Sequence, residues 1–177
     1  MQKATPDQQP RPLSGSVMIP DKLVQFLEQR ANVAFAGTRN RELVPFGHRV
    51  SGWSVGTDRR TLTAFTPEPL SADLVESLQT NAELALTVES FPAHETYQFK
   101  GRYVSHRTVH HEDIVLVDRI RERFIKNMRT VFPALPEHIV GAFVSTPAFA
   151  VAFEVSEIFL QTPGPGAGTR IVPPVPA

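Results

Sequence analysis

The chain has 177 residues, no cysteine, and 18 basic side chains balanced by 18 acidic ones. This length fits one domain around a single core. The charge balance argues against binding to nucleic acid or to an anionic membrane surface, and the lack of cysteine excludes disulfides, thiolate metal sites and cysteine nucleophiles. The first residues hold no apolar run typical of a signal peptide, and no later segment is apolar enough over the length of a bilayer. We therefore expect a cytoplasmic protein.

Composition divides the chain into three parts. Residues 1–18 are polar and contain prolines, and residues 162–177 are rich in glycine and proline. Segments of this kind bury little apolar surface. We expect a flexible tail over 1–18, a folded domain over 19–161, and a flexible arm over 162–177 for which contact with a partner subunit is one interpretation.

The first predicted elements are one helix and three strands. They are a helix from Pro20, a strand over 32–39, a strand over 44–53 and a strand over 61–66. Proline suits the first turn of a helix, and β-branched and aromatic residues at alternating positions are typical of strands. Residues 56–60 are predicted to form the hairpin turn between the last two strands.

Alternation along the strand 44–53 assigns its side chains to two faces. One face takes Val44, Phe46, His48 and Val50. The other face takes Pro45, Gly47, Arg49, Ser51 and Trp53.

The second half repeats helix and strand patterns. In order it holds a helix after Pro69 with Ser71 as its N-cap, strands over 83–90 and 95–106, a helix over 110–128, a short helical turn ending near Gly141, and a strand from 148. Serine at an N-cap accepts a bond from a free backbone amide. Gly101 in the middle of a strand predicts a bulge or a close approach by another backbone. The fold class is therefore mainly β with α (α+β), and six strands form a small open barrel.

This order of elements, with GRYV in the fifth strand and VAFEVSEIF in the last, resembles the FMN-binding split-barrel family that includes pyridoxamine 5′-phosphate oxidase. The resemblance covers residues 19–161. It implies a six-stranded antiparallel split β-barrel with packed helices, a homodimer, and FMN bound at the subunit interface. For an enzyme it implies a flavin-dependent oxidoreductase, in which the flavin carries the hydride chemistry.

The resemblance also implies cofactor-binding residues. Arg49 stands near the place of a family arginine that contacts the flavin phosphate, and Phe65 with Thr66 matches an aromatic–threonine pair at a strand end. Ser71 matches a phosphate-binding serine, although residues 72–73 are alanine and aspartate where family members carry basic residues. The chain also lacks the glutamine that the oxidase itself carries five residues before the glycine of the fifth strand, so activity on pyridoxamine phosphate is not expected.

Side-chain chemistry points to some of the same positions. Arg49 can pair with a phosphate through two hydrogen bonds, and Ser51 on the same face adds a neutral donor. Lys100 can place a positive charge near a flavin ring or a phosphate. The alternatives are structural: Arg49 in water with Trp53 in the core, and Lys100 solvated at the rim of a dimer.

Three further candidates lie at the end of the strand 61–66. Thr63, Phe65 and Thr66 offer hydroxyls and backbone amides just before a helix begins. The first amides of a helix lack partners inside it and attract anions. The structural alternative is that TLTAFT is an ordinary buried strand.

The six histidines predict no metal site. His110 and His111 are adjacent and diverge on a helix or strand, and no pair has the spacing of a helical zinc motif. His94 beside Glu95 is the best catalytic candidate among them. No GxSxG motif supports serine hydrolase chemistry.

We expect a protein that binds FMN or a related small molecule and resembles pyridoxamine 5′-phosphate oxidase-like oxidoreductases, as a homodimer with no nucleic-acid or membrane partner. Two alternatives stay open. One is a non-catalytic protein of the same fold that binds or senses a flavin or haem. The other is a barrel that has lost its cofactor.

Overall fold

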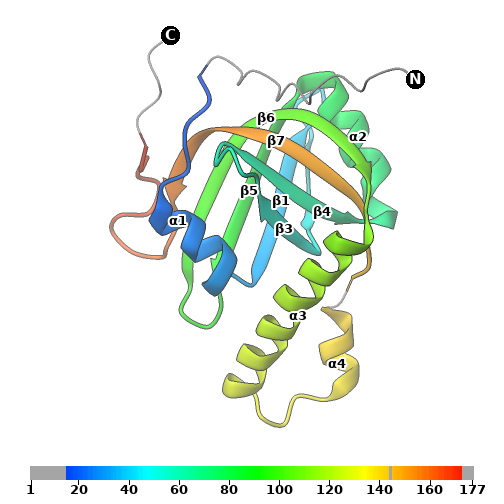
Figure 1. The fold of residues 1–177 in the computed structure, drawn as a ribbon, viewed down its shortest axis with the longest axis vertical. Helices are drawn as coiled ribbons and strands as arrows, with labels where there is room; N and C mark the ends of the chain where they lie inside the picture. The colour runs from blue at the N-terminus through cyan, green and yellow to red at the C-terminus, as the bar shows by residue number, and fades with distance from the viewer. Residues whose placement is uncertain (1–14, 144, 173–177) are drawn as a thin grey trace, which may run out of the picture.

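The computed structural model describes residues 15–143 and 145–172, without the side chains of 68–73 and 142. In this part seven antiparallel strands form one sheet that curls into a barrel, with helices around it (Figure 1). The strands are β1 (Val33–Arg39), β2 (Pro45–Arg49), β3 (Gly52–Val55), β4 (Thr61–Pro67), β5 (Glu83–Ser90), β6 (Glu95–Thr108) and β7 (Pro147–Leu160). The helices are α1 (Asp21–Gln25), the π-helix η1 (Phe26–Arg30), α2 (Glu68–Asn81), α3 (His111–Val131) and α4 (Glu137–Ala142).

The barrel closes at the link between β2 and β3. The strand order is β2-β1-β5-β6-β7-β4-β3, so these two consecutive strands lie at opposite edges of the sheet. The amide of Val50 donates to the carbonyl of Ala34 beside β2, and the next amide, of Ser51, donates to the carbonyl of Phe65 on β4. The chain thus changes edge within two residues. The prediction of six strands is wrong for this reason, because the expected strand 44–53 is divided here into β2 and β3.

The bend also changes which side chains share a face. Alternation predicts Val50 and Trp53 on opposite faces, yet both are buried in the same core cluster. The indole nitrogen of Trp53 donates to the carbonyl of Leu27 at 3.2 Å. Because alternation holds only along a continuous strand, it fails across this bend, and Trp53 is a core residue.

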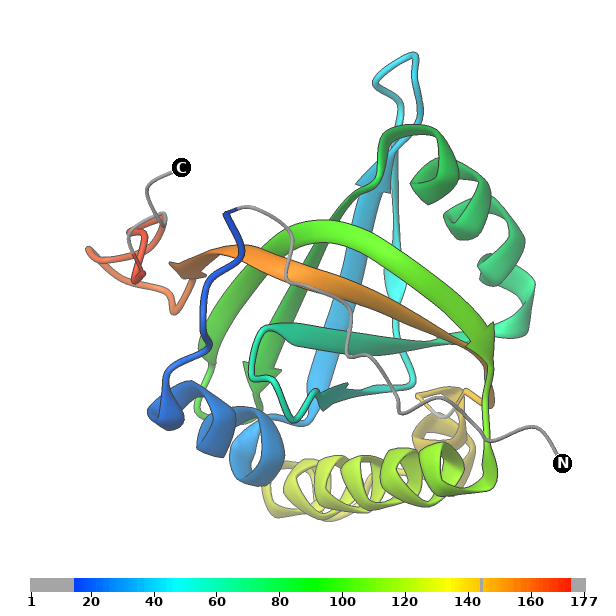
Figure 2. The same cartoon turned by 45° about the horizontal axis from the view of Figure 1, so that its top comes forward.

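Apolar side chains from both halves of the sheet fill the barrel. Five of the large fully buried ones are Leu62, Leu86, Phe99, Phe153 and Ile158. Burying one such side chain contributes roughly 1.5–3 kcal/mol to folding. Figure 2 shows α2 beside the hairpin of β1 and β2 at one end of the barrel, and α3 with α4 at the other end.

The prediction for Gly101 is confirmed on both counts. The register between β6 and β7 shifts between Lys100 and Gly101, which is a bulge. A Cβ atom at Gly101 would overlap the carbonyl oxygen of Glu154 on β7. Only glycine allows the two backbones to approach this closely.

The prediction of Ser71 as a helix cap is wrong. Helix α2 begins at Glu68, and Pro67 takes the N-cap position. Pro69 stands in the first turn, where the amide that proline lacks needs no partner. Ser71 therefore lies within the helix, with its side chain outside the described part of the structure.

The folded part begins earlier than residue 19. Val17 is fully buried, and its amide donates to the carbonyl of Val155 on β7 at 2.7 Å. Residues 15–18 of the expected tail therefore join the barrel. The rest of that tail, residues 1–14, lies outside the described residues.

The folded part also ends later than residue 161. After β7 the chain turns back, and the amide of Ile171 donates to the carbonyl of Ile158 at 2.8 Å. We call residues 162–172 the C-terminal turn. Within the described chain this turn packs against its own β7, and residues 173–177 of the expected arm lie outside the described residues. None of the described helices combines the length and the apolar character needed to cross a membrane.

Candidate functional site

A hollow with a volume of about 970 Å³ lies on the outer face of the sheet. We call it the outer groove. One row of paired residues crosses it through five strands: Gly47, Gly37, Ala85, Lys100 and Glu157. Three of these positions have a small side chain or none, and the last two are charged. The row is therefore hollow at one end and ionic at the other.

The hollow depends on Gly37, which has no side chain at a position of β1 that faces outward. Along β1 the even-numbered residues Ala34 and Ala36 are buried, so Gly37 faces outward by alternation. A Cβ atom at Gly37 would have its nearest neighbour, the carbonyl oxygen of Phe46, at 4.0 Å. The space above this glycine is open, and a larger residue there would fill the groove.

Two ion pairs at the groove neutralise charges of the protein. The guanidinium of Arg39 contacts the carboxylate of Glu83 at 2.9 Å. The carboxylate of Glu157 pairs with the guanidinium of Arg170, which comes from the C-terminal turn. Both acidic residues that line the groove are therefore already paired.

Two cations at the groove have no such partner. Lys100 and Arg102 line the groove from β6, and neither forms an ion pair with any residue in the described part of the chain. The ammonium nitrogen of Lys100 lies 4.6 Å from the ring centre of Phe159. A cation over an aromatic face gains about 0.5–1 kcal/mol at an exposed site. The groove thus presents uncompensated positive charge.

A second candidate region lies where β2 turns into β3, and helices cover it. The strands β6 and β7 are paired neighbours, yet residues 110–146 leave between them, and the amide of Val109 donates to the carbonyl of Ala148 at the point of departure. We call residues 110–146 the helical excursion. Its helix α3 buries Val117, Ile120 and Phe124 against the barrel.

The excursion holds the side chain of Arg49. A guanidinium nitrogen of Arg49 donates to the carbonyl oxygen of Phe143, and the group lies 4.8 Å from the ring centre of Phe124 and 5.4 Å from that of Phe143. Burial here lowers the pKa of Arg49. The hydroxyls of Ser51 and Ser145 share a 2.9 Å hydrogen bond. Arg49 and Ser51 therefore fasten the excursion to the barrel.

The space around Arg49 is small. The cleft that Arg49 and Ser51 line has a volume of about 10 Å³. A cavity needs about 10–15 Å³ to hold a single water molecule. With the excursion in this position, the cleft has no room for a phosphate group.

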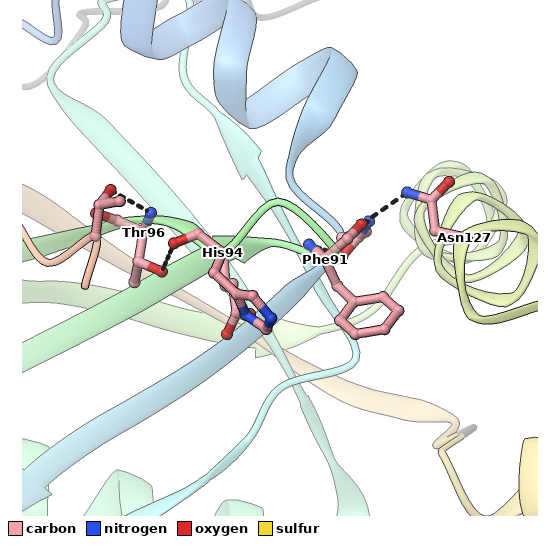
Figure 3. A network of polar contacts seen from close by, with 7 residues as sticks. Phe91, His94, Thr96 and Asn127 are labelled. Atoms are coloured by element: carbon pink, nitrogen blue, oxygen red, sulfur yellow. Dashed lines mark hydrogen bonds and ion pairs between the residues drawn. The ribbon is translucent and has the colours of Figure 1, made fainter. Parts of the chain in front are cut away.

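Figure 3 shows how the far end of α3 is tied to the turn between β5 and β6. The side-chain amide of Asn127 donates to the carbonyl of Phe91 at 2.9 Å, and the hydroxyl of Thr96 donates to the carbonyl of His94. The imidazole of His94 contacts the carboxylate of Glu89 at 2.6 Å. His94, the catalytic candidate of the sequence, therefore stabilises a turn and lies outside the outer groove.

The three candidates on β4 lie apart from the groove. Thr63 is half-buried, and Phe65 is buried against Val117 of α3. Thr66 is fully buried, and its hydroxyl lies 3.4 Å from the carbonyl oxygen of Phe149. Phe65 thus belongs to the region that the excursion covers, whereas Thr66 contacts β7.

His48 faces the interior, away from the groove. It is paired with the buried Ala36, is 8% exposed, and neither ring nitrogen has a hydrogen-bond partner in the described structure. Burial lowers the pKa of His48 because the charged ring is poorly solvated there. None of the described histidines lines the outer groove, and the described residues contain no cluster of three or more possible metal ligands.

No family model and no curated protein matches the chain. Solved structures do match it. HupZ of Group A Streptococcus is 12% identical, with 85% of this chain and 100% of that chain covered and a TM-score of 0.50. The chain has a split-barrel fold. An FMN-binding protein from Syntrophomonas wolfei is 10% identical, with 78% and 82% covered and a TM-score of 0.49. The heme storage protein HutZ of Vibrio cholerae is 12% identical, with 81% and 95% covered and a TM-score of 0.42.

Similarity at these identities concerns the fold alone. The curled antiparallel sheet and its surrounding helices confirm the resemblance to the FMN-binding split barrels at the level of the fold.

The seven residues predicted to bind a cofactor lie in different parts of the split barrel. Lys100 lines the outer groove, whereas Arg49, Ser51 and Phe65 lie under the helical excursion. Thr66 is buried beside β7. Thr63 lies further along β4, and Ser71 lies in α2. Contact of any of these residues with a cofactor stays a prediction.

Most residues that line the outer groove were not predicted from the sequence. Gly37, Gly47, Ala85 and Arg102 were not among the candidates, although all four line it. The available signal was glycine at an outward position in two strands, which marks a place where a ligand or another backbone can approach.

Proposed function

We propose that this split barrel binds FMN in the outer groove. The observation that supports it best is the combination of a glycine-lined floor with the uncompensated cations Lys100 and Arg102. The groove volume, about 970 Å³, lies at the upper end of the range for small-molecule sites, about 300–1,000 Å³. A planar ring system can lie on a sheet surface free of side chains, and a phosphate suits two nearby cations.

The residues of the groove divide the recognition between them. Gly37 and Gly47 allow a ring to approach the backbone of β1 and β2, while Lys100 and Arg102 on β6 attract the phosphate. FMN supplies hydride transfer when bound. The protein positions the flavin and sets the charge around it, which suits a flavin-dependent oxidoreductase and equally a protein that stores or senses the flavin.

A homodimer is part of this proposal. Phe35, one row from the glycines on the same face of β1, is 51% exposed, and Leu43 at the edge of the groove is 66% exposed. Apolar side chains beside an open groove are typical of a surface that a partner covers. A second copy of the chain over this face would exclude water from the ligand.

Titration with FMN and with riboflavin, which lacks the phosphate, tests the proposal. We expect FMN to bind more tightly, and Lys100→Met to weaken FMN about ten- to hundredfold through loss of a charge-assisted contact. Riboflavin affinity should change little. Lys126→Met, a change at a lysine of α3 outside the groove, is the matched control.

Three results would change the proposal: the first would revise the role of Lys100, and the other two would contradict FMN binding. Equal losses for both ligands would place Lys100 against the flavin ring. A Soret band with added haem, without FMN binding, would favour the haem-binding alternative. A protein that ignores both ligands would support a barrel without a cofactor.

A further inference from the structure

The C-terminal turn places Arg170 beside the outer groove without making it part of the lining. Arg170 bridges to Phe159 of β7 through the backbone, and its guanidinium lies 5.5 Å from the ring centre of that phenylalanine. The same guanidinium pairs with Glu157, which does line the groove. Arg170 thus acts on the groove through an acidic neighbour.

Glu157 has a second cation within reach. Lys100 on β6 stands directly opposite Glu157 in the register of β6 and β7. Opposite charges at such positions have Cβ atoms about 4.5–5.5 Å apart and usually attract each other. In this structure, however, Glu157 pairs with Arg170, and the ammonium of Lys100 lies over the ring of Phe159 instead.

We propose that Arg170 sets the charge of the groove by competing with Lys100 for Glu157. With Arg170 in place, its positive charge offsets Glu157, and Lys100 remains available to an anionic ligand. Without Arg170, the carboxylate of Glu157 would pair with Lys100 and remove that charge from the groove. Arg170 is therefore a positioning residue, and the C-terminal turn determines whether the groove selects anions. The choice of FMN as the anion rests on the proposed function.

Removal of the arginine tests this competition. Arg170→Ala should weaken FMN about five- to tenfold while leaving riboflavin affinity unchanged, a range expected for the loss of one partly exposed charge. Arg170→Lys should recover most of the affinity, because a lysine also offsets Glu157. Arg129→Ala breaks an exposed arginine–glutamate pair on the helical excursion and is the matched control.

A double variant separates competition from a structural role. In Arg170→Ala/Glu157→Gln no carboxylate remains to capture Lys100, so FMN affinity should return to the wild-type value. A merely structural Arg170 predicts no such rescue. If FMN binds the wild-type chain and Arg170→Ala changes nothing, or if the double variant fails to recover, the inference is overturned.

A second measurement needs no ligand and keeps this inference distinguishable from the proposed function. The ¹H–¹⁵N signal of the Lys100 ammonium, assigned with Lys100→Met, should exchange with water more slowly in Arg170→Ala, where Glu157 holds it, and quickly again in the double variant. If FMN fails to bind the wild-type chain, the proposed function is wrong. The Lys100 signal then still tests whether Arg170 and Lys100 compete for Glu157. A signal that is the same in all three proteins overturns it.

Discussion

The outer groove and the covered region around Arg49 are neighbours on one face of β2, where Gly47 and Arg49 are two residues apart. Both regions combine positive charge with aromatic rings. In the groove, Lys100 lies over one ring and remains open to a ligand. Under the excursion, Arg49 lies against Phe124 and Phe143 and donates to a carbonyl, in a cleft of about 10 Å³.

The difference shows that residue type alone does not determine the role of a cation on a strand. An arginine is chemically the better partner for a phosphate. Here the arginine fastens a helical segment, and the lysine has the free space. The role of each cation depends on which part of the chain covers its strand. The segment that covers Arg49 includes Phe143, which is 94 residues away in sequence.

Blocking the groove should have the largest effect. Gly37→Phe places a ring in the hollow above β1, and we expect FMN affinity to fall about hundredfold or more, equivalent to roughly 2.7 kcal/mol or above. Stability should hold, because glycine within a strand is itself unfavourable by roughly 0.5–1 kcal/mol. Calorimetric titration and urea unfolding measure the two quantities.

Thr87→Phe is the control for this substitution, since Thr87 lies on β5 one row away and does not line the groove. Unchanged FMN affinity in Gly37→Phe would place the flavin elsewhere on the barrel and remove the contrast between the two regions.

In the covered region around Arg49, we expect a substitution to lower the stability of the protein and to leave ligand binding unchanged. Arg49→Ala removes a hydrogen bond from a charged donor to the carbonyl of Phe143 together with two ring contacts, so the free energy of unfolding should fall by about 2–3 kcal/mol. Arg49→Lys should recover only part. Urea unfolding followed by tryptophan fluorescence measures the loss, and FMN affinity should stay near that of the wild type.

The opposite pattern would reverse the assignment of the two regions. Normal stability in Arg49→Ala, with weaker binding of FMN but not of riboflavin, would show that the excursion opens and that Arg49 meets the phosphate, as the family resemblance implies.

We expect the smallest effect, on the pH dependence of stability, from His48 on the inner face of β2. Burial lowers its pKa from the ordinary value of 6.5, so the unfolded chain binds more protons than the folded one as the pH falls below that value. The free energy of unfolding should therefore decrease as the pH falls from 7 toward the pKa of the folded state. His48→Leu should make this dependence shallower, as measured by urea unfolding at several pH values.

His138→Gln, at an exposed histidine of α4, should keep the wild-type dependence. An unchanged slope in His48→Leu would mean that other groups cause it.

Local features of the fold could be predicted from the sequence. Gly101 was correctly expected to mark a bulge, and the periodicity of residues 110–128 correctly indicated α3. The bend after Arg49 could not be predicted, because it depends on two consecutive amides finding partners on distant strands, Ala34 and Phe65. Periodicity reports how a segment is shaped, but not which strand it pairs with.

The same limit applies to the site. Lys100 was predicted as a charge near a ligand, and it does line the groove. The groove itself arises from the register of five strands, which brings Gly37, Gly47 and Ala85 into one row with it. No one segment contains that row. Arg49 was chosen for its chemistry, and the phenylalanines that enclose it come from a helical segment whose docking position the local pattern does not show.

The helical excursion leaves and rejoins the sheet at one place, beside the hydrogen bond between Val109 and Ala148. The pairing of β6 with β7 continues to Thr108 and Phe149, next to this junction. Because this register does not require a particular length of chain beyond the junction, we expect changes of length there to leave it unshifted. We expect a version of the chain with a short turn here to keep the strand order, to lose the buried contacts of α3, and to expose Arg49 and Phe65 to solvent. A single insertion point thus governs which face of the barrel is open.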